Sequence, residues 1–302
     1  MIVNRKNLDL AFVNLRTIFN NAFTSTDTQW QNVAMLIPST TSTEDYSWLS
    51  DFPRMREWIG EKVLRSLAAF NYVLKNRDFE ATVEVDRNDI KDDRLGIYGV
   101  KAQSAGQSAA FWPDELVFEL VNKAFQTRCF DNQYFFDTDH KVAGQSVSNM
   151  FTRPLSIATQ AEARASFGAA RTAMRKFKND EGQPLKVRPN ILLVPPALED
   201  IANTLMTTDR LEDGKPNLYK GAAKVVVSDE LISDTAWFLL DTTKPVKPFI
   251  FQEREKPEFV QQTDMSSDAV FLTKKFRFGA EARGEAGFGF WQLAFGSTGD
   301  NS

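Results

Sequence analysis

Residues 70–86 read FNYVLKNRDFEATVEVD, and the second half of this stretch alternates strictly between apolar and polar side chains. One face of the predicted strand carries Phe79, Ala81, Val83 and Val85. The opposite face carries Glu80, Thr82, Glu84 and Asp86. A period of two is typical of a β-strand with one buried face. Together with an apolar run at 70–74 and a polar turn at 75–78, the pattern predicts a β-hairpin.

The predicted hairpin needs support, because a two-stranded ribbon is at best marginally stable alone in water. The N-terminal stretch 4–23 raises the same question, since its apolar residues recur at the spacing of an amphipathic helix. Such a helix either docks on its own domain or serves as an arm that docks on a neighbour. We expect the chain to be unable to bury both elements alone, so that other copies of it cover them.

A long helix is predicted after the hairpin. Residues 113–126, PDELVFELVNKAFQ, place polar side chains on a narrow stripe and apolar ones around most of the remaining circumference. Pro113 either opens this helix or kinks a longer one that begins near Asp93, and we favour the longer helix. Because most of its circumference is apolar, we expect this helix to make contacts on more than one side.

The remaining segments predict a mixed α+β arrangement. Residues 24–45 are rich in Ser and Thr and are interpreted as an extended linker. Helices are predicted over 159–178 and 197–208, and strands over 190–194, 224–227, 237–241 and 249–251. The region from Ala269 is predicted to be β-structure and to end in the apolar strand FGFWQLAF over 288–295.

Composition narrows the function. The 302 residues suffice for one large domain or two ordinary ones. A net charge of −4 argues against a protein whose main task is to grip nucleic acid phosphates. The single cysteine, Cys129, excludes an intrachain disulfide, and no apolar run approaches the ~20 residues that a membrane span needs. The 25 Phe residues predict either a Phe-rich core or buried interfaces between subunits.

Two groups of residues are candidates for chemistry. Asp137, Asp139 and His140 lie within four residues and could bind a divalent metal, although the same DTDH pattern is typical of a turn. Cys129 and His140 form a second candidate pair, weighed against a half-buried structural cysteine. We expect no catalytic residue, no metal and no cofactor.

Residues 48–62 mix aromatic side chains with arginines. This pattern suggests either single-stranded nucleic acid binding or a protein interface. The acidic residues nearby favour the protein interface.

Four segments carry a resemblance to a known family. They are WLSDFPRMREWIGEKV (48–63), NRDFEATVEVDRNDIKDD (76–93), YFFDTDHKV (134–142) and Trp291 to Gly296. In this order they resemble the major head protein of Mu-like phages and prophages. The resemblance implies an α+β structure with the Johnson fold of tailed-phage major capsid proteins. That fold has an N-terminal arm, an extended β-hairpin loop that reaches over a neighbouring subunit, a peripheral domain with a long spine helix, and an axial domain.

Applied to this chain, the implied fold divides the sequence into five segments. We place the N-terminal arm at 1–42, the extended loop at 43–86, the peripheral domain with its spine helix at 87–152, the axial domain at 153–255, and the C-terminal strands of the peripheral domain at 256–302.

The resemblance implies a structural protein and not an enzyme. Its subunits would self-assemble as pentamers and hexamers into an icosahedral head shell that encloses double-stranded DNA, which the shell contacts non-specifically. It implies a virion capsid protein that is assembled in the bacterial host cytoplasm. The expected partners are a separate scaffold, a maturation protease, a portal protein and a decoration protein. Two alternatives remain open, a bacterial nanocompartment shell of the same fold and a cytosolic α+β metal-dependent enzyme.

The predicted interface residues are aromatic or apolar side chains of the arm, of the loop and of the hairpin. They are Phe12, Phe19, Trp58, Phe70, Tyr72, Phe79 and Val83. Some shells of this fold are stabilised by covalent links between Lys and Asn side chains, and Lys75 and Asn76 are adjacent in this sequence. Because no matching acidic environment is evident in the sequence, we predict non-covalent assembly.

Overall fold

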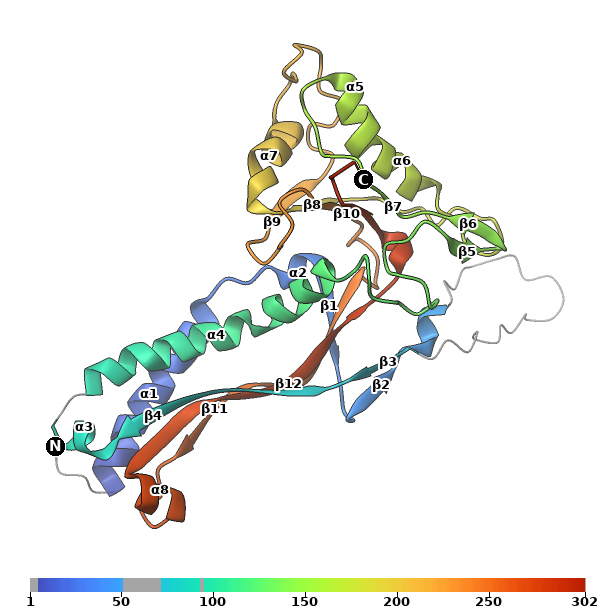
Figure 1. Cartoon of the computed structure of the whole chain (residues 1–302). Coiled ribbons are helices and arrows are strands. Elements are labelled where there is room, and N and C mark those ends of the chain that lie inside the picture. The colour runs from blue at the N-terminus through green and yellow to red at the C-terminus, as the bar shows by residue number, and fades with distance from the viewer. Residues whose placement is uncertain (1–4, 51–71, 93–94, 302) are drawn as a thin grey trace.

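The computed structural model of the chain describes residues 5–50, 72–92 and 95–301. Figure 1 shows an elongated lower region, built from a long sheet and two helices, and a triangular upper region that contains a second sheet. A short ribbon, formed by β2 (Thr43–Asp45) and β3 (Val73–Lys75), leaves the lower region on the right of this view.

The long sheet has four strands in the order β1–β11–β12–β4. These are β1 (Ala34–Pro38), β11 (Phe249–Gln262), β12 (Lys275–Phe288) and β4 (Arg77–Asp86). The last three pair antiparallel, whereas β1 runs parallel to β11. Alternation along the strands gives the sheet one apolar face and one charged face. The charged face is exposed.

Helices α1 (Arg5–Ser25) and α4 (Leu95–Asn122) cover the apolar face and pack on each other. The ring of Phe12 meets Phe276 and Phe278 edge-on, with centroids 6.3 and 6.2 Å apart. A Cβ at Gly106 would lie 2.4 Å from the carbonyl oxygen of Phe19. The two helices therefore approach closely because Gly106 has no side chain.

The prediction of one long helix is confirmed, because α4 continues through Pro113 and contacts both α1 and the sheet. Next to Pro113, the carboxylate of Asp114 accepts hydrogen bonds from the backbone N–H groups of Gln29 (3.0 Å) and Trp30 (2.7 Å). These bonds tie the start of α2 (Trp30–Val33) to α4.

The upper sheet has five strands in the order β7–β13–β10–β8–β9. These are β7 (Met150–Phe151), β13 (Ala294–Ser297), β10 (Trp237–Leu240), β8 (Ile191–Val194) and β9 (Lys224–Val227). All residues of β8, β10 and β13 are buried. Helices α5 (Gln160–Ala163), α6 (Ala169–Lys176) and α7 (Glu199–Thr207) belong to this region, and a π-helical turn over 164–168 joins α5 to α6.

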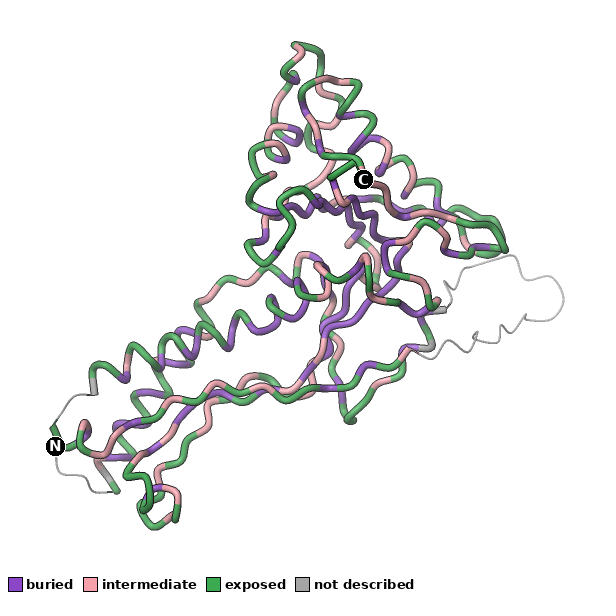
Figure 2. Tube along the Cα trace, in the orientation of Figure 1, coloured by how far each residue is buried: buried purple, intermediate pink, exposed green. Residues whose placement is uncertain are grey.

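Phenylalanine rings connect the two sheets. Phe135 stacks on Phe288 at the end of β12, with centroids 4.4 Å apart and planes 10° apart. Its neighbour Phe136 stacks on Phe238 of β10, at 5.4 Å. The two regions therefore share one apolar core, seen in Figure 2 as the buried trace that runs from the long sheet into the upper one.

Shorter elements complete the described chain. They are α2 (Trp30–Val33), η1 (Ser47–Ser50), α3 (Arg87–Lys91), the small hairpin β5 (His140–Val142) with β6 (Gln145–Val147), η3 (Pro196–Leu198), α8 (Asp268–Thr273) and η4 (Trp291–Leu293). No helix within 5–50, 72–92 and 95–301 is long and apolar enough to cross a membrane.

The predicted hairpin between 70–74 and 79–86 is wrong. β3 pairs with β2, and β4 pairs with β12 about 200 residues further along the chain. Residues 75–78 do not reverse the chain, because only Asn76 separates β3 from β4. The strand alternation was read correctly, but it carries no information about which strand lies alongside.

Three other local predictions need correction. Residues 34–38, assigned to an extended linker, form β1 at the edge of the long sheet, where they pair with β11. Residues 269–273, predicted to be β-structure, belong to α8, which turns the chain between β11 and β12 and whose N-terminus is capped by the hydroxyl of Ser267. The strand predicted over 288–295 is interrupted by η4, so that β12 ends at Phe288 and β13 begins at Ala294. In each case the local sequence pattern did not reveal the tertiary contacts that decide the structure.

The expectation that other copies must bury the N-terminal helix and the strand over 79–86 is also wrong. Within one chain, α1 lies on α4 and on the sheet, and β4 is hydrogen-bonded to β12. Phe12 and Phe19 are 0% and 1% exposed. The single subunit shelters both elements.

Candidate assembly surfaces and the buried Cys129–Asp131–His140 cluster

The predicted interface residues fall into three groups in the structure. Phe12 and Phe19 lie inside the subunit. Tyr72, Phe79 and Val83 are half-buried. Trp58 and Phe70 lie outside the described residues, as does most of the aromatic and arginine-rich stretch 48–62. The described part of the chain therefore brings Tyr72, Phe79 and Val83 toward its own core and leaves only their outer edges accessible.

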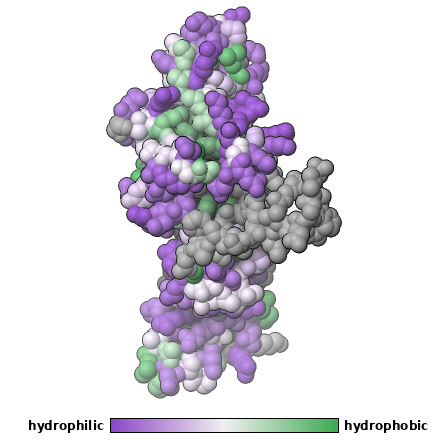
Figure 3. Space-filling model, turned by 90° about the vertical axis from the view of Figure 1, so that its right-hand side faces the viewer, coloured by the Kyte–Doolittle hydropathy of each residue, from purple (hydrophilic) through white to green (hydrophobic). Residues whose placement is uncertain are grey.

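Apolar side chains that the subunit does not cover lie elsewhere. Phe271 and Leu272 of α8 are 77% and 79% exposed, at the far end of the long sheet. Ile97 and Val100 of α4 are also exposed, as are Leu10 and Val13 of α1. In the side view of Figure 3 apolar areas are small and separated by hydrophilic ones. Sequence reasoning missed these positions, because Phe271 and Leu272 were assigned to β-structure and an outward-facing apolar residue of a helix has no signal of its own in the sequence.

Ion pairs cross the exposed face of the long sheet. Arg283 of β12 bridges Asp78 of β4 (2.5 Å) and Glu255 of β11 (3.1 Å). Glu84 pairs with Lys275 and, at 3.0 Å, with Arg277. The hydrogen bonds from Lys275 and Arg277 lower the pKa of Glu84. Between these groups the register sets Glu80, Glu281 and Glu258 side by side, an arrangement of like charges that costs stability.

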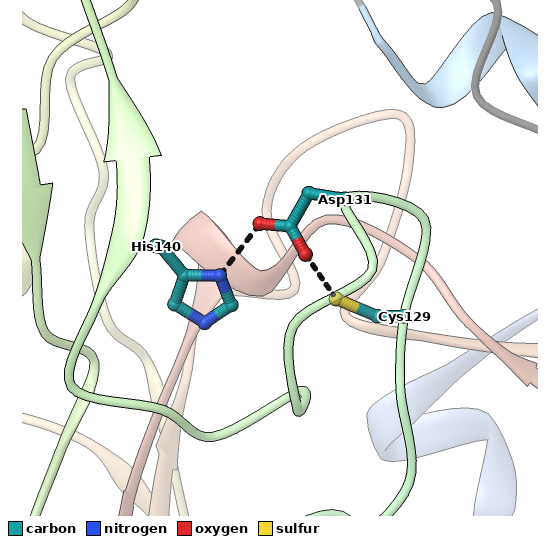
Figure 4. Close-up of side chains that lie close together, drawn as sticks. All are labelled: Cys129, Asp131 and His140. Carbon is teal, nitrogen blue, oxygen red and sulfur yellow. Dashed lines mark hydrogen bonds and ion pairs between the residues drawn. The ribbon is translucent and has the colours of Figure 1, made fainter. Parts of the chain in front are cut away.

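Cys129, Asp131 and His140 form a buried cluster (Figure 4). The Cys129 thiol donates to one carboxylate oxygen of Asp131 at 3.1 Å, and the other oxygen lies 2.6 Å from His140 Nδ1. The His140 ring is 0% exposed and stacks on Trp291 with centroids 4.0 Å apart. Asp131 thus holds both partners, which explains their spacing without an ion.

The electrostatics of the cluster do not favour a nucleophile. Burial and the nearby Asp131 carboxylate raise the pKa of the Cys129 thiol, so the thiol stays protonated. Burial alone would raise the pKa of Asp131, but the hydrogen bond and charge of His140 outweigh it and lower that pKa. The carboxylate stands between the thiol and the imidazole, so His140 does not act as a base toward Cys129.

The candidate metal group is not assembled. Asp137 accepts from the backbone N–H groups of Tyr134 (3.2 Å) and Thr138 (2.6 Å), as a turn residue does. Asp139 accepts from the side chain of Gln133 at 3.0 Å. Sequence reasoning missed Asp131, whose only signal was its place two residues after Cys129.

Asn76 is a structural residue here. It is 6% exposed, and its amide nitrogen donates to Ser39 Oγ (2.9 Å) and to the carbonyl of Thr41 (2.8 Å). Its amide oxygen accepts from Gln252 Nε2 at 2.7 Å. The side chain is therefore committed within the subunit, and non-covalent assembly stays a prediction.

The fold places the chain in a class of proteins. The chain is similar to a subunit of the bacteriophage JBD30 procapsid, with 30% identity and a TM-score of 0.62, over 98% of this chain and 76% of that one. It is also similar to a subunit of the JBD30 capsid decorated with minor capsid protein trimers, with 30% identity and a TM-score of 0.61, over 70% of this chain and 93% of that one. The structure has the fold of tailed-phage major capsid proteins.

The sequence comparisons identify the family. The model of the Mu-like prophage major head subunit gpT matches residues 8–158, 155–231 and 228–301. The major capsid protein of Escherichia phage Mu is 31% identical over 300 residues, which cover 99% of this chain and 76% of that protein. The chain belongs to the family of Mu-like prophage major head subunits. It is a structural protein of the head shell and not an enzyme.

Proposed function

We propose that the chain self-assembles as pentamers and hexamers into an icosahedral shell that encloses double-stranded DNA. The observation that carries the proposal is the joint match of sequence and fold to phage capsid subunits along nearly the whole chain. Many moderate contacts suffice in such an assembly, because a closed shell multiplies them. The net charge of −4 is compatible with a shell protein that contacts DNA non-specifically.

The five-segment division remains part of the proposal, with its boundaries moved to fit the strands. The arm would end before β1, because Ala34–Pro38 pair with β11. The extended loop would end near Asn76, because Arg77–Asp86 belong to the long sheet. The loop is then the β2–β3 ribbon and the residues between its strands. The long sheet with α4 would form the peripheral domain, on which the α1 arm packs, and β11 would belong to it from Phe249 onward. The five-stranded sheet would form the axial domain, with β7 and β13 added to it from outside 153–255.

We assign subunit contacts to the loop residues Trp58, Phe70 and Tyr72, and to the edges of Phe79 and Val83. Phe12 and Phe19 would contribute indirectly, by fixing α1 on the subunit. We further propose a scaffold, a maturation protease, a portal protein and a decoration protein as partners, and assembly in the cytoplasm of the bacterial host. The decorated JBD30 capsid supports the decoration partner.

Negative-stain microscopy of the chain, expressed with and without the neighbouring phage genes, tests this proposal. We expect closed, regular particles when the head genes are present. Subunits that stay unassembled with the complete set of head genes would overturn it. Closed particles that enclose a protein cargo, formed without any other head gene, would favour the nanocompartment alternative instead.

A further inference from the structure

The β2–β3 ribbon is too small to hold its own direction. Within the described residues it contains the pairs Thr43–Lys75, Glu44–Leu74 and Asp45–Val73, with one flanking backbone hydrogen bond at each end. A two-stranded ribbon of this size is marginal without support. The direction in which it leaves the long sheet therefore depends on contacts at its root.

A single buried side chain of the long sheet is hydrogen-bonded to residues that follow each of the two strands of the ribbon. Gln252 of β11 is 0% exposed. Its amide oxygen accepts from the hydroxyl of Tyr46, which follows β2, at 2.8 Å. Its amide nitrogen donates to the amide oxygen of Asn76, which follows β3, at 2.7 Å. Both strands of the ribbon are thus connected to the same residue of β11.

The network continues from Asn76 into the turn that leads to β2. Ser39 Oγ accepts from Asn76 and donates to the Glu44 carboxylate at 2.8 Å. Glu44 also accepts from the backbone N–H groups of Thr40 (2.9 Å) and Thr41 (3.3 Å). The backbone N–H of Ser39 in turn donates to the carbonyl of Glu253 in β11, at 2.8 Å. Buried polar groups that are satisfied in this way specify one arrangement, because hydrogen bonds are directional.

Independent packing supports the same direction. Leu74 of β3 sits over Gly287 of β12, where a Cβ would lie 2.2 Å from Leu74 Cδ1. The hydroxyl of Tyr72 accepts from the backbone N–H of Phe288 at 2.7 Å. The apolar contact keeps β3 packed on the long sheet, whereas the polar network fixes the angle between the ribbon and the sheet.

We propose that Gln252 and Asn76 are positioning residues that set the direction of the β2–β3 ribbon, and that this direction governs accurate shell assembly. The second half of this statement rests on the proposed function. Apolar side chains at the positions of Gln252 and Asn76 would bury the same surface. They would not fix the angle between the ribbon and the sheet, since apolar contacts are non-directional. A protein that repeats one contact around a closed shell needs that angle to be the same in every copy.

The test replaces the polar root by an apolar one. The double variant Gln252→Leu/Asn76→Leu removes both amides, and Gln261→Leu is a matched control because Gln261 is exposed on the same strand. Spin labels at Thr43→Cys and Lys256→Cys report the distance between the ribbon and β11 by pulsed electron paramagnetic resonance. Both positions are exposed, whereas Cys129 is 5% exposed.

We expect a single narrow distance peak in the wild-type subunit and in Gln261→Leu, and loss of that peak in the double variant. An unchanged narrow peak in the double variant would overturn the positioning role, whatever the outcome of assembly. If the double variant does not fold, Gln252→Glu serves instead, because it keeps the acceptor for Tyr46 and loses the donor to Asn76.

Assembly is measured separately, by counting regular closed particles in micrographs of the same variants expressed with the head genes. We expect Gln261→Leu to match the wild type and the double variant to lose closed particles in favour of open or irregular ones. Normal particles from a variant with a broadened distance peak would overturn the link to assembly. Absence of particles from the wild type would instead count against the proposed function, while the distance experiment still decides the positioning role.

Discussion

The two sheets of this subunit differ in how they are covered. The strands β8, β10 and β13 of the upper sheet are buried along their whole length. The long sheet instead buries one face under α1 and α4 and exposes ion pairs on the other. A fully buried strand identifies itself by an unbroken apolar run, but a half-buried strand shows only its period. The first kind of sheet is therefore easier to predict, and the second is easier to extend with contacts to other copies.

The largest expected effect is in the upper sheet. Trp237 of β10 is 0% exposed, and its indole N–H donates to the carbonyl of Arg153 at 3.0 Å. We expect Trp237→Ala to lower the free energy of unfolding by about 3–5 kcal/mol, measured by urea unfolding of the subunit. Ile232→Ala is the control, since Ile232 is 84% exposed, and it should change that free energy by less than about 0.5 kcal/mol. Equal effects would remove the contrast between core and surface.

A second prediction tests whether the long sheet is covered by its own helix. Phe12→Ala should lower the free energy of unfolding of the unassembled subunit by about 3 kcal/mol, because it removes a ring packed between Phe276 and Phe278. Val13→Ala, one position along on the exposed side, should have little effect. If both variants unfold like the wild type, α1 docks on a neighbour and the subunit described above is wrong.

The buried cluster gives a pH-dependent prediction. The pKa of Asp131 is lowered in the folded subunit, because the hydrogen bond and charge of His140 outweigh the burial that would raise it. A lowered folded pKa means that the contribution is present above the unfolded value, near 3.9, and is lost as the pH falls through the folded value. Asp131→Asn should lower the free energy of unfolding by about 3 kcal/mol at neutral pH.

The same variant should also show a shallower loss of stability below about pH 4 than the wild type. Asp139→Asn is the control, because Asp139 is a more exposed carboxylate that precedes His140 in the chain. Thermal or urea unfolding across the acid range measures both. An acid dependence in Asp131→Asn that matches the wild type would show that the pair with His140 does not contribute.

The smallest effect is expected for an exposed ion pair at the edge strand β4 of the long sheet. Arg77 pairs with Glu285 at 2.6 Å, but the Arg77 side chain is 50% exposed. Arg77→Met should change the free energy of unfolding of the subunit by no more than about 1 kcal/mol, and the difference should shrink at high salt. A larger effect that does not respond to salt would mean that this ion pair is buried rather than exposed.

The sequence predicted individual elements better than their neighbours. The long helix and the strands β8, β9 and β10 of the upper sheet were recognised because their periodicity or apolar run is local. The partner of β4 was not, since β12 lies about 200 residues away and nothing in an alternating strand names its neighbour. The network around Gln252 was equally invisible, because Ser39, Asn76 and Gln252 come together only after three strands have paired.

The N-terminal helix and the strand over 79–86 were expected to need other copies for their burial, and that expectation is wrong. One subunit buries both the N-terminal helix and β4, so these elements do not by themselves require other copies. The head-shell assignment depends on the resemblance of the sequence, which the family match and the capsid structures confirm. The described surface instead offers exposed side chains such as Phe271 and Leu272 to neighbours.

Hydrogen exchange on the unassembled subunit shows whether α1 and β4 are already folded onto each copy before it joins a shell. We expect slow exchange of the amides of α1 and of the β4–β12 ladder in the free subunit, at rates close to those of β8 and β10. Fast exchange of α1 and β4 in the free subunit, with protection gained only in assembled particles, would contradict it.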